Sequence, residues 1–155
     1  MAPLVVQLIA WGIAWSAGAA DLVPVLAAPV EALRVALAVM FVFTAVAHFV
    51  PRTRADMLAM VPSALPMPGA LVTVTGVLEL VGAVGLILPR WNRWAALALA
   101  ALLIAMFPAN IHAARTGITI AGRRAMAVLP RLALQLFWIG CLLWVALESG
   151  GGRAP

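Results

Sequence analysis

Five long apolar runs dominate the hydrophobic pattern of the chain, separated by short segments that carry charge, proline or glycine. About 20 apolar residues in a helix cross the roughly 30 Å hydrocarbon core of a bilayer, so each run has the length of a membrane span. The predicted spans are Leu4–Ala20, Ala32–Phe49, Gly69–Leu88, Trp94–Ala113 and Ala127–Leu147. The pattern predicts an all-α fold, a polytopic bundle of transmembrane helices.

The first run has two interpretations. Its small-residue ending, SAGAAD, is typical of a signal-peptidase site, but the basic residues that precede the apolar part of a signal peptide are missing. We therefore favour a retained helix. The predicted organisation is an additional N-terminal helix or signal segment over 1–20, a transmembrane bundle over 32–147, and a flexible tail over 148–155.

The composition agrees with a membrane protein. Hydrophobic residues make up 66% of the 155 residues and charged residues only 10%, with a mean hydropathy of +1.13. The formal charge of +5 comes from arginines scattered between apolar runs, which form no basic face for nucleic acid. Cys141 is the single cysteine, so the chain has no internal disulfide and no CxxC pair.

The arginines predict an orientation. The connections after the second and fourth spans hold more of them than the opposite side does, and the positive-inside rule places the richer side in the cytoplasm. The richer side comprises Arg52, Arg54, Arg115, Arg123 and Arg124, with Arg131 just inside the last span. Five spans would then put the N-terminus in the cytoplasm and the C-terminus outside.

Small residues predict where helices approach one another. Gly12, Ser16 and Ala20 are spaced at four in the first span, and an alanine stripe spaced at four runs over 101–113 in the fourth. In the third span, Gly76 and Gly82 lie three residues before and after Glu79, on one side of the helix. The connection after the second span has four prolines, and residues 54–61 within it are predicted to form a short interfacial helix.

Glu79 is the candidate centre of a site, because an ionised carboxylate in the middle of a span costs about 2.5–3.5 kcal/mol on insertion scales. It should face the interior, as a proton-handling or ligand-binding group or as an interhelical hydrogen-bond anchor. Helix directions bring His48, Asn110, Arg131 and Gln135 to the same end of the bundle. These residues predict one ligand-binding pocket that opens toward the cytoplasm.

Other polar residues extend or qualify this picture. Thr44 and Thr75 would continue the polar track. Pro108 frees a backbone carbonyl, for which Asn110 is the predicted hydrogen-bond partner. No metal site is predicted, because two histidines and few acids give no recognisable ligand set; a haem between His48 and His112 is a minor alternative.

Several motifs resemble the DoxX-like family of small bacterial membrane proteins. They are the His-Phe helix end at His48, the MVP…LP.P connection, the helix TG.LEL.GA.GL around Glu79, the PAN motif at 108–110 and the Arg131…Gln135 helix. The resemblance covers about 33–144 and implies a four-helix bundle, with the first helix as an addition. It also implies a bacterial cytoplasmic membrane and a link to quinone oxidoreductases, but no settled catalytic residue, so none is assigned.

Three functions remain open from the sequence. The leading one is a quinone-linked redox or redox-associated subunit, with a quinone as the cofactor it would bind and a redox partner protein to supply electrons. The second is a binding or transport protein for a small metabolite or lipid. The third is a scaffold of a membrane complex. Whether the chain is itself an enzyme, and whether it self-associates, the sequence does not decide.

Overall fold

The computed structural model describes residues 2–120 and 122–151 and is built on five long α-helices. They are α1 (Ala2–Ala19), α2 (Pro29–Ala47), α4 (Pro68–Ile87), α5 (Asn92–Thr116) and α6 (Val128–Gly151). Each coincides with a predicted span to within a few residues, and all five are long and apolar enough to cross a membrane. The predicted all-α fold is confirmed. The last helix continues to Gly151, into the predicted tail, and residues 152–155 lie outside the described part.

Proline and glycine set several helix ends. Pro29, Pro51 and Pro68 occupy the first turns of their helices, where the missing N–H costs nothing and the fixed φ suits the helix. Gly117 ends α5 in the left-handed region with φ 69°, which glycine adopts without strain. The sequence thus marks the boundaries as well as the spans.

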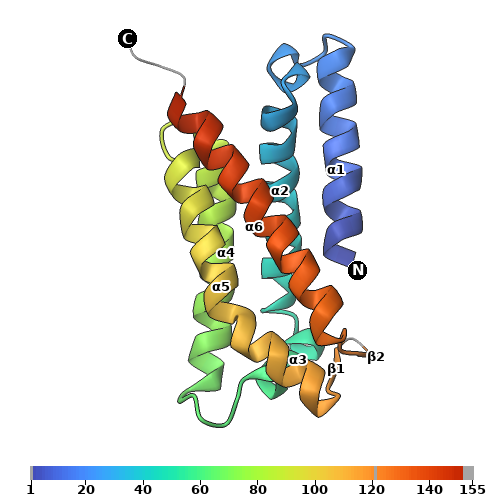
Figure 1. Ribbon diagram of the computed structural model, residues 1–155, viewed down its shortest axis with the longest axis vertical. Helices are drawn as coiled ribbons and strands as arrows, with labels where there is room; N and C mark the ends of the chain where they lie inside the picture. The colour runs from blue at the N-terminus through green and yellow to red at the C-terminus, as the bar shows by residue number, and fades with distance from the viewer. Residues whose placement is uncertain (1, 121, 152–155) are drawn as a thin grey trace.

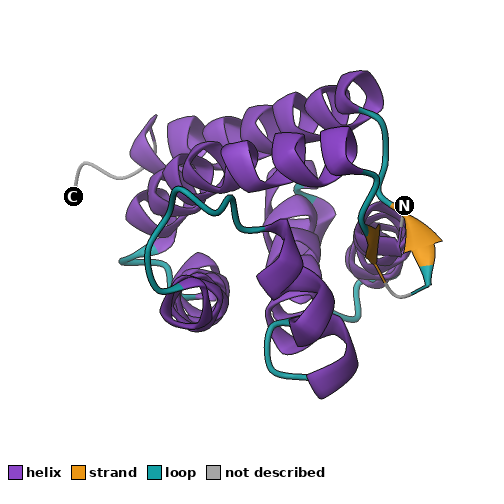
Figure 2. Ribbon diagram, turned by 90° about the horizontal axis from the view of Figure 1, so that it is seen from below, coloured by secondary structure: helices purple, strands orange, loops and turns teal. Residues whose placement is uncertain are grey.

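The long helices form two layers. Helices α1, α2 and α4 stand side by side in a row with α2 in the middle, and α5 and α6 pack together and cross this row obliquely (Figures 1 and 2). The loops 20–28 and 88–91 and the end of α6 lie at one end of the bundle, which we call the tryptophan end. The opposite end, with the loops 61–67 and 117–127, is called the hairpin end.

Short elements complete the two ends. At the tryptophan end, a 3-10 helix, η1 (Pro24–Ala27), connects α1 to α2. At the hairpin end lie α3 (Pro51–Met60) and the antiparallel strands β1 (Thr119–Ile120) and β2 (Arg123–Arg124). Helix α3 confirms the predicted short helix in the proline-rich connection. Two strands of two residues leave the fold class all-α.

The core lies where α2 meets α4, α5 and α6. Its largest fully buried side chains include Leu37, Phe41, Leu86, Leu99 and Leu142. The glycines of α4 allow close contact: a Cβ on Gly82 would lie 2.4 Å from Leu99 Cδ2, and one on Gly85 would lie 2.7 Å from the Ala95 Cβ. Glycine notches on this helix therefore admit side chains of α5, as the sequence predicts.

The predicted stripe of small residues in the first span is wrong, and the one in the fourth span is wrong over most of its length. Gly12, Ser16 and Ala20 are exposed, and α1 instead buries Gln7, Ala14 and Gly18. In α5 the buried residues lie mostly in the first half of the helix, at Ala95, Ala96, Leu99 and Ala100. Of the predicted stripe, Ala101 and Ala105 are exposed, Ala109 is half-buried and Ala113 is buried. Because alanine and glycine are frequent on every face of these helices, spacing at four does not select the face that packs.

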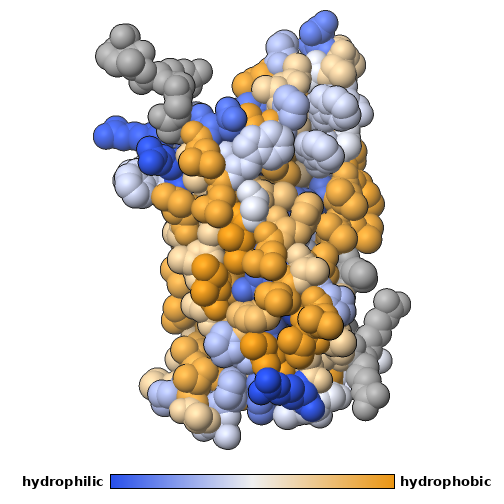
Figure 3. Space-filling view, in the orientation of Figure 1, coloured by the Kyte–Doolittle hydropathy of each residue, from blue (hydrophilic) through white to orange (hydrophobic). Residues whose placement is uncertain are grey.

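The surface is that of a multi-pass membrane protein. A broad apolar band covers the middle of the visible face, with hydrophilic residues gathered toward both ends (Figure 3). Exposed indoles lie toward the tryptophan end, at Trp15, Trp91, Trp94 and Trp144, and the Trp11 and Trp15 rings stack with centroids 6.0 Å apart. Tryptophan is typical of the membrane–water interface, so these positions fit one boundary of a bilayer.

Phe41 and Phe43 provide a matched test of the packing, because Phe41 is 1% exposed and Phe43 is 45% exposed on the same helix. We expect Phe41→Ala to lower the free energy of unfolding by on the order of 2 kcal/mol. In a membrane the lost side chain would otherwise contact lipid, which is also apolar, so the main cost of the substitution is the cavity it leaves. Phe43→Ala should have less than half that effect. The measurement is denaturant unfolding in detergent micelles, and equal losses for both variants would contradict the packing described.

Candidate functional site

Glu79 lies inside the bundle, on the face of α4 that packs against α2. It is 4% exposed, and the Thr44 hydroxyl of α2 lies 2.8 Å from its Oε2. The same hydroxyl lies 3.1 Å from the Phe41 carbonyl oxygen. The acid in the middle of the span is thus buried against protein and has a hydrogen-bond partner, as its cost in lipid requires.

His48 caps the C-terminal end of α2 and turns its ring toward α4. Its Nδ1 lies 2.8 Å from the Val72 carbonyl oxygen and 3.3 Å from the Thr75 hydroxyl oxygen. Because a carbonyl oxygen only accepts hydrogen bonds, Nδ1 must carry a hydrogen and donate it to Val72. In the neutral ring this leaves Nε2 as the acceptor.

The free nitrogen of His48 faces the acid. His48 Nε2 lies 3.8 Å from Glu79 Oε2, a separation that suits an ion pair but is too long for a hydrogen bond. Both side chains are shielded from solvent, His48 at 7% and Glu79 at 4% exposure. A lone ionised carboxylate is costly there, so the pair favours states with one proton between its two members, either on Glu79 or on Nε2.

Thr44 suits both protonation states of the acid. A hydroxyl is one donor and two acceptors. When Glu79 is ionised, Thr44 donates to Oε2; when Glu79 is protonated, the carboxyl group donates to Thr44, whose own hydrogen turns to the Phe41 carbonyl. The proton on the pair can therefore change place without leaving a buried polar group unpaired.

Two contacts hold His48 in place. A Cβ on Gly76 would lie 2.7 Å from the His48 Cβ, so only glycine lets the ring pack this close to α4. Arg54 of α3 donates from Nη1 to the His48 carbonyl oxygen at 3.0 Å, and from Nη2 to the Gly69 carbonyl at 3.1 Å and Thr73 Oγ1 at 2.9 Å. Helix α3 thereby ties the end of α2 to the first turn of α4.

The other three predicted site residues lie between α5 and α6. The Arg131 guanidinium donates to Asn110 Oδ1 at 2.6 Å, and Gln135 Nε2 donates to the Leu103 carbonyl oxygen at 2.9 Å. The prediction that Asn110 compensates for Pro108 therefore needs correcting: Gln135 bonds a carbonyl in the turn before the proline, while Asn110 accepts from Arg131.

The structure thus brings the five residues into two groups. His48 and Glu79 face each other between α2 and α4, and Asn110, Arg131 and Gln135 join α5 to α6. No hydrogen bond or ion pair within 2–120 and 122–151 connects the groups. None of the five residues lines the hollow at the tryptophan end or the hollow at the hairpin end that is formed by 114–117, Ala125 and Ala127. A single pocket lined by all five residues stays a prediction.

Two contacts were not anticipated. Arg54 has the contacts given above, which its place in a proline-rich connection does not reveal. Gln7 of α1 is buried and accepts a 2.7 Å hydrogen bond from Trp138 Nε1 of α6. The sequence signal for the Gln7 contact was a single amide side chain inside an apolar run.

Over the described residues, no group of three or more His, Cys, Asp or Glu side chains is placed to hold a metal ion.

Comparison with known families identifies the chain. A family model, the domain of unknown function DUF8561, matches residues 37–146, which is more than half of the sequence. The chain belongs to the DUF8561 family. The match starts inside α2 and ends inside α6, so α1 lies outside it. No curated protein and no solved structure matches.

This membership corrects the predicted resemblance to the DoxX-like family, which is wrong. The motifs behind the resemblance have local structural causes in this DUF8561 member: Gly76 and Gly82 admit His48 and Leu99, and Arg131 and Asn110 bond each other. The DUF8561 description gives no activity, so it adds no role to any residue.

Gly76 gives a test of the close approach of His48. Gly76→Ala should push the imidazole away from α4, lower the free energy of unfolding by roughly 1–3 kcal/mol, and shift the ring resonances of His48 in NMR spectra. Gly140→Ala is the control, because a Cβ there meets nothing within 4 Å. Unchanged His48 resonances in Gly76→Ala would contradict the contact.

Proposed function

We propose that this membrane protein binds a small hydrogen-bonding head group between its helices and exchanges a proton with it through Glu79 and His48. The observation that carries the proposal is the position of His48: its Nδ1 is committed to Val72, and its Nε2 faces Glu79 at 3.8 Å. A buried pair with one exchangeable proton and a hydroxyl that serves both states is the arrangement that general acid–base chemistry needs.

A quinone head group is the ligand class that fits this chemistry. Its ring is apolar enough to enter from the bilayer, its carbonyl oxygens accept hydrogen bonds, and its reduction to quinol takes up two electrons and two protons. The pair would supply one of the protons and recover it from the aqueous side. The electrons would come from a redox partner protein, and the second proton from water.

Access would require a local movement. Glu79 and His48 are almost completely covered, so a head group reaches them only if α4 moves away from α2. Helix α3 is placed to control such a movement, because Arg54 joins both helices at the hairpin end. We place this end in the cytoplasm, on the basis of its arginines.

One observation favours a second function, a structural anchor. Glu79, His48 and Thr75 all have partners within the chain, which is also what a purely interhelical connection would show. Such an anchor would hold α2 to α4 and would not need a carboxyl proton. Replacing the acid by its amide separates the two functions, because glutamine keeps the size and hydrogen-bonding capacity of the side chain.

We expect Glu79→Gln to remain folded and to bind a short-chain quinone about tenfold more weakly than the wild type, the effect of one strong hydrogen bond. Binding by the wild type should change with pH, because a proton is linked to it, whereas Glu79→Gln should lose this dependence. The measurements are calorimetric titration with the quinone in nanodiscs at several pH values, together with thermal unfolding.

Asp21→Asn is the matched control. It removes an exposed acid in the loop after α1, and asparagine tolerates the positive φ of 55° at this position. It should bind quinone as the wild type does. If Glu79→Gln unfolds earlier but binds quinone normally, the anchor is correct. If the wild type binds no quinone, the quinone proposal fails, and uptake of small metabolites becomes the next assay.

A further inference from the structure

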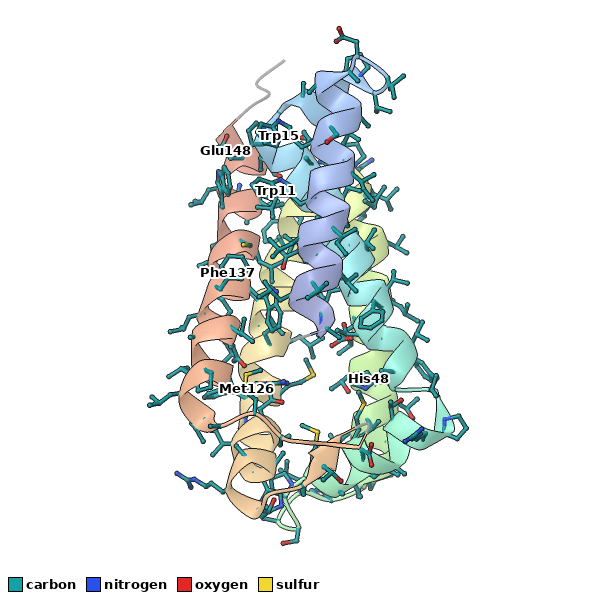
Figure 4. The ribbon with its side chains drawn as sticks, turned by 90° about the vertical axis from the view of Figure 1, so that its right-hand side faces the viewer. Trp11, Trp15, His48, Met126, Phe137 and Glu148 are labelled. Atoms are coloured by element: carbon teal, nitrogen blue, oxygen red, sulfur yellow. The ribbon has the colours of Figure 1, made fainter. Side chains whose placement is uncertain are left out.

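A second polar site lies at the tryptophan end, far along the bundle from His48. It is a hollow of about 330 Å³ between the start of α2, the start of α5 and the end of α6. Three valines and Pro89 form its apolar walls, and its polar lining consists of Glu31, Arg34, Asn92, Glu148 and Ser149. Figure 4 shows Glu148 at the same end as Trp11 and Trp15, with His48 toward the other end. The volume is at the lower end of the range of ligand pockets, about 300–1,000 Å³.

The lining offers hydrogen-bond donors on α2 and α5. Arg34 forms an ion pair with Glu31 through Nη2, but its buried Nε has no hydrogen-bond partner within the described chain. Asn92 is 7% exposed and accepts at Oδ1 from the Arg93 amide N–H at 2.7 Å, which assigns its Nδ2 as the remaining donor. Both side chains therefore retain donor capacity for an anionic oxygen.

The lining also offers an acceptor, on α6. Glu148 makes no hydrogen bond or ion pair with another described residue, in contrast to Glu31, whose charge is balanced by Arg34. Ser149 lies beside it on α6 and adds a hydroxyl. An ammonium group would be stabilised here by charge and by N–H donation to the carboxylate.

From this arrangement we propose that the hollow binds a zwitterionic group with the chemistry of phosphoethanolamine, its ammonium on Glu148 and its anionic oxygens toward Arg34 and Asn92. Donors on α2 and α5 and an acceptor on α6 suit a ligand that carries both charges better than a simple cation or anion, either of which would leave one of these groups unpaired. The exposed tryptophans place the hollow at the depth of lipid head groups. The source is a phosphatidylethanolamine lipid of the membrane or a free zwitterion in the water.

The test uses the full chain in nanodiscs of phosphatidylcholine, to which phosphatidylethanolamine or soluble phosphoethanolamine is added. Native mass spectrometry counts the molecules retained. We expect retained phosphatidylethanolamine in the wild type, with about tenfold weaker retention in Glu148→Gln, the loss expected for one charge-assisted hydrogen bond. Glu148 is at the surface, so this variant should fold, and Asp21→Asn, which changes an acid outside the hollow, should retain the lipid as the wild type does.

The two probes distinguish a lipid head group from a soluble zwitterion as the ligand of the hollow. Displacement of the lipid by phosphoethanolamine would identify a site open to soluble zwitterions, whereas retention of the lipid alone would identify a head-group site. Phosphatidylcholine is the chemical control, because its trimethylammonium group has no N–H to donate. The proposal is overturned if phosphatidylcholine competes equally, if Glu148→Gln retains phosphatidylethanolamine unchanged, or if neither probe binds the wild type.

Discussion

The energetic cost of a carboxyl group at the middle of a membrane span is the constraint on which the rest of the structure depends. Glu79 has to face protein, so α4 turns this side toward α2, where Thr44 and His48 contact it or face it. Gly76 is then required because the ring of His48 lies where a Cβ would be. Arg54 in turn secures the His48 carbonyl from α3. The contacts around this acid explain how α2, α3 and α4 come to lie together.

The spans were predictable from sequence because their signal is long and repeated: about 20 apolar residues bounded by proline, glycine or charge. The interior position of Glu79 and the glycine notches followed from the same reasoning. The packing faces of α1 and α5 did not, because small residues occur all around these helices and spacing alone cannot give their rotation. Nor do the depths of the five polar residues give their partners: the observed contacts form two groups, and the single pocket stays a prediction. The family resemblance failed because its motifs have local packing causes in this chain, as at Gly76 and Arg131, and such motifs do not by themselves identify a family.

The polar groups are distributed between the two ends. Toward the hairpin end, the polar side chains form hydrogen bonds with one another or with the backbone, as Glu79, His48, Arg54 and Asn110 do. Such satisfied groups suit a site that opens only when helices move. At the tryptophan end, Glu148 has no such partner among the described residues and lines a hollow already present. A protein with both features would respond to the bilayer at its interface and hold a proton in its interior, and the two properties can be measured independently because they use different residues.

The central claim is that His48 donates from Nδ1 to Val72 and shares one proton with Glu79 through Nε2. The most direct measurement is the nitrogen-15 NMR spectrum of the two ring nitrogens of His48, identified by comparison with a His48→Gln variant. The account predicts that Nδ1 carries a hydrogen throughout the pH range in which the protein is folded, and that the Nε2 resonance alone moves when Glu79 is replaced by glutamine. A ring with hydrogen on Nε2 and a bare Nδ1 would contradict it.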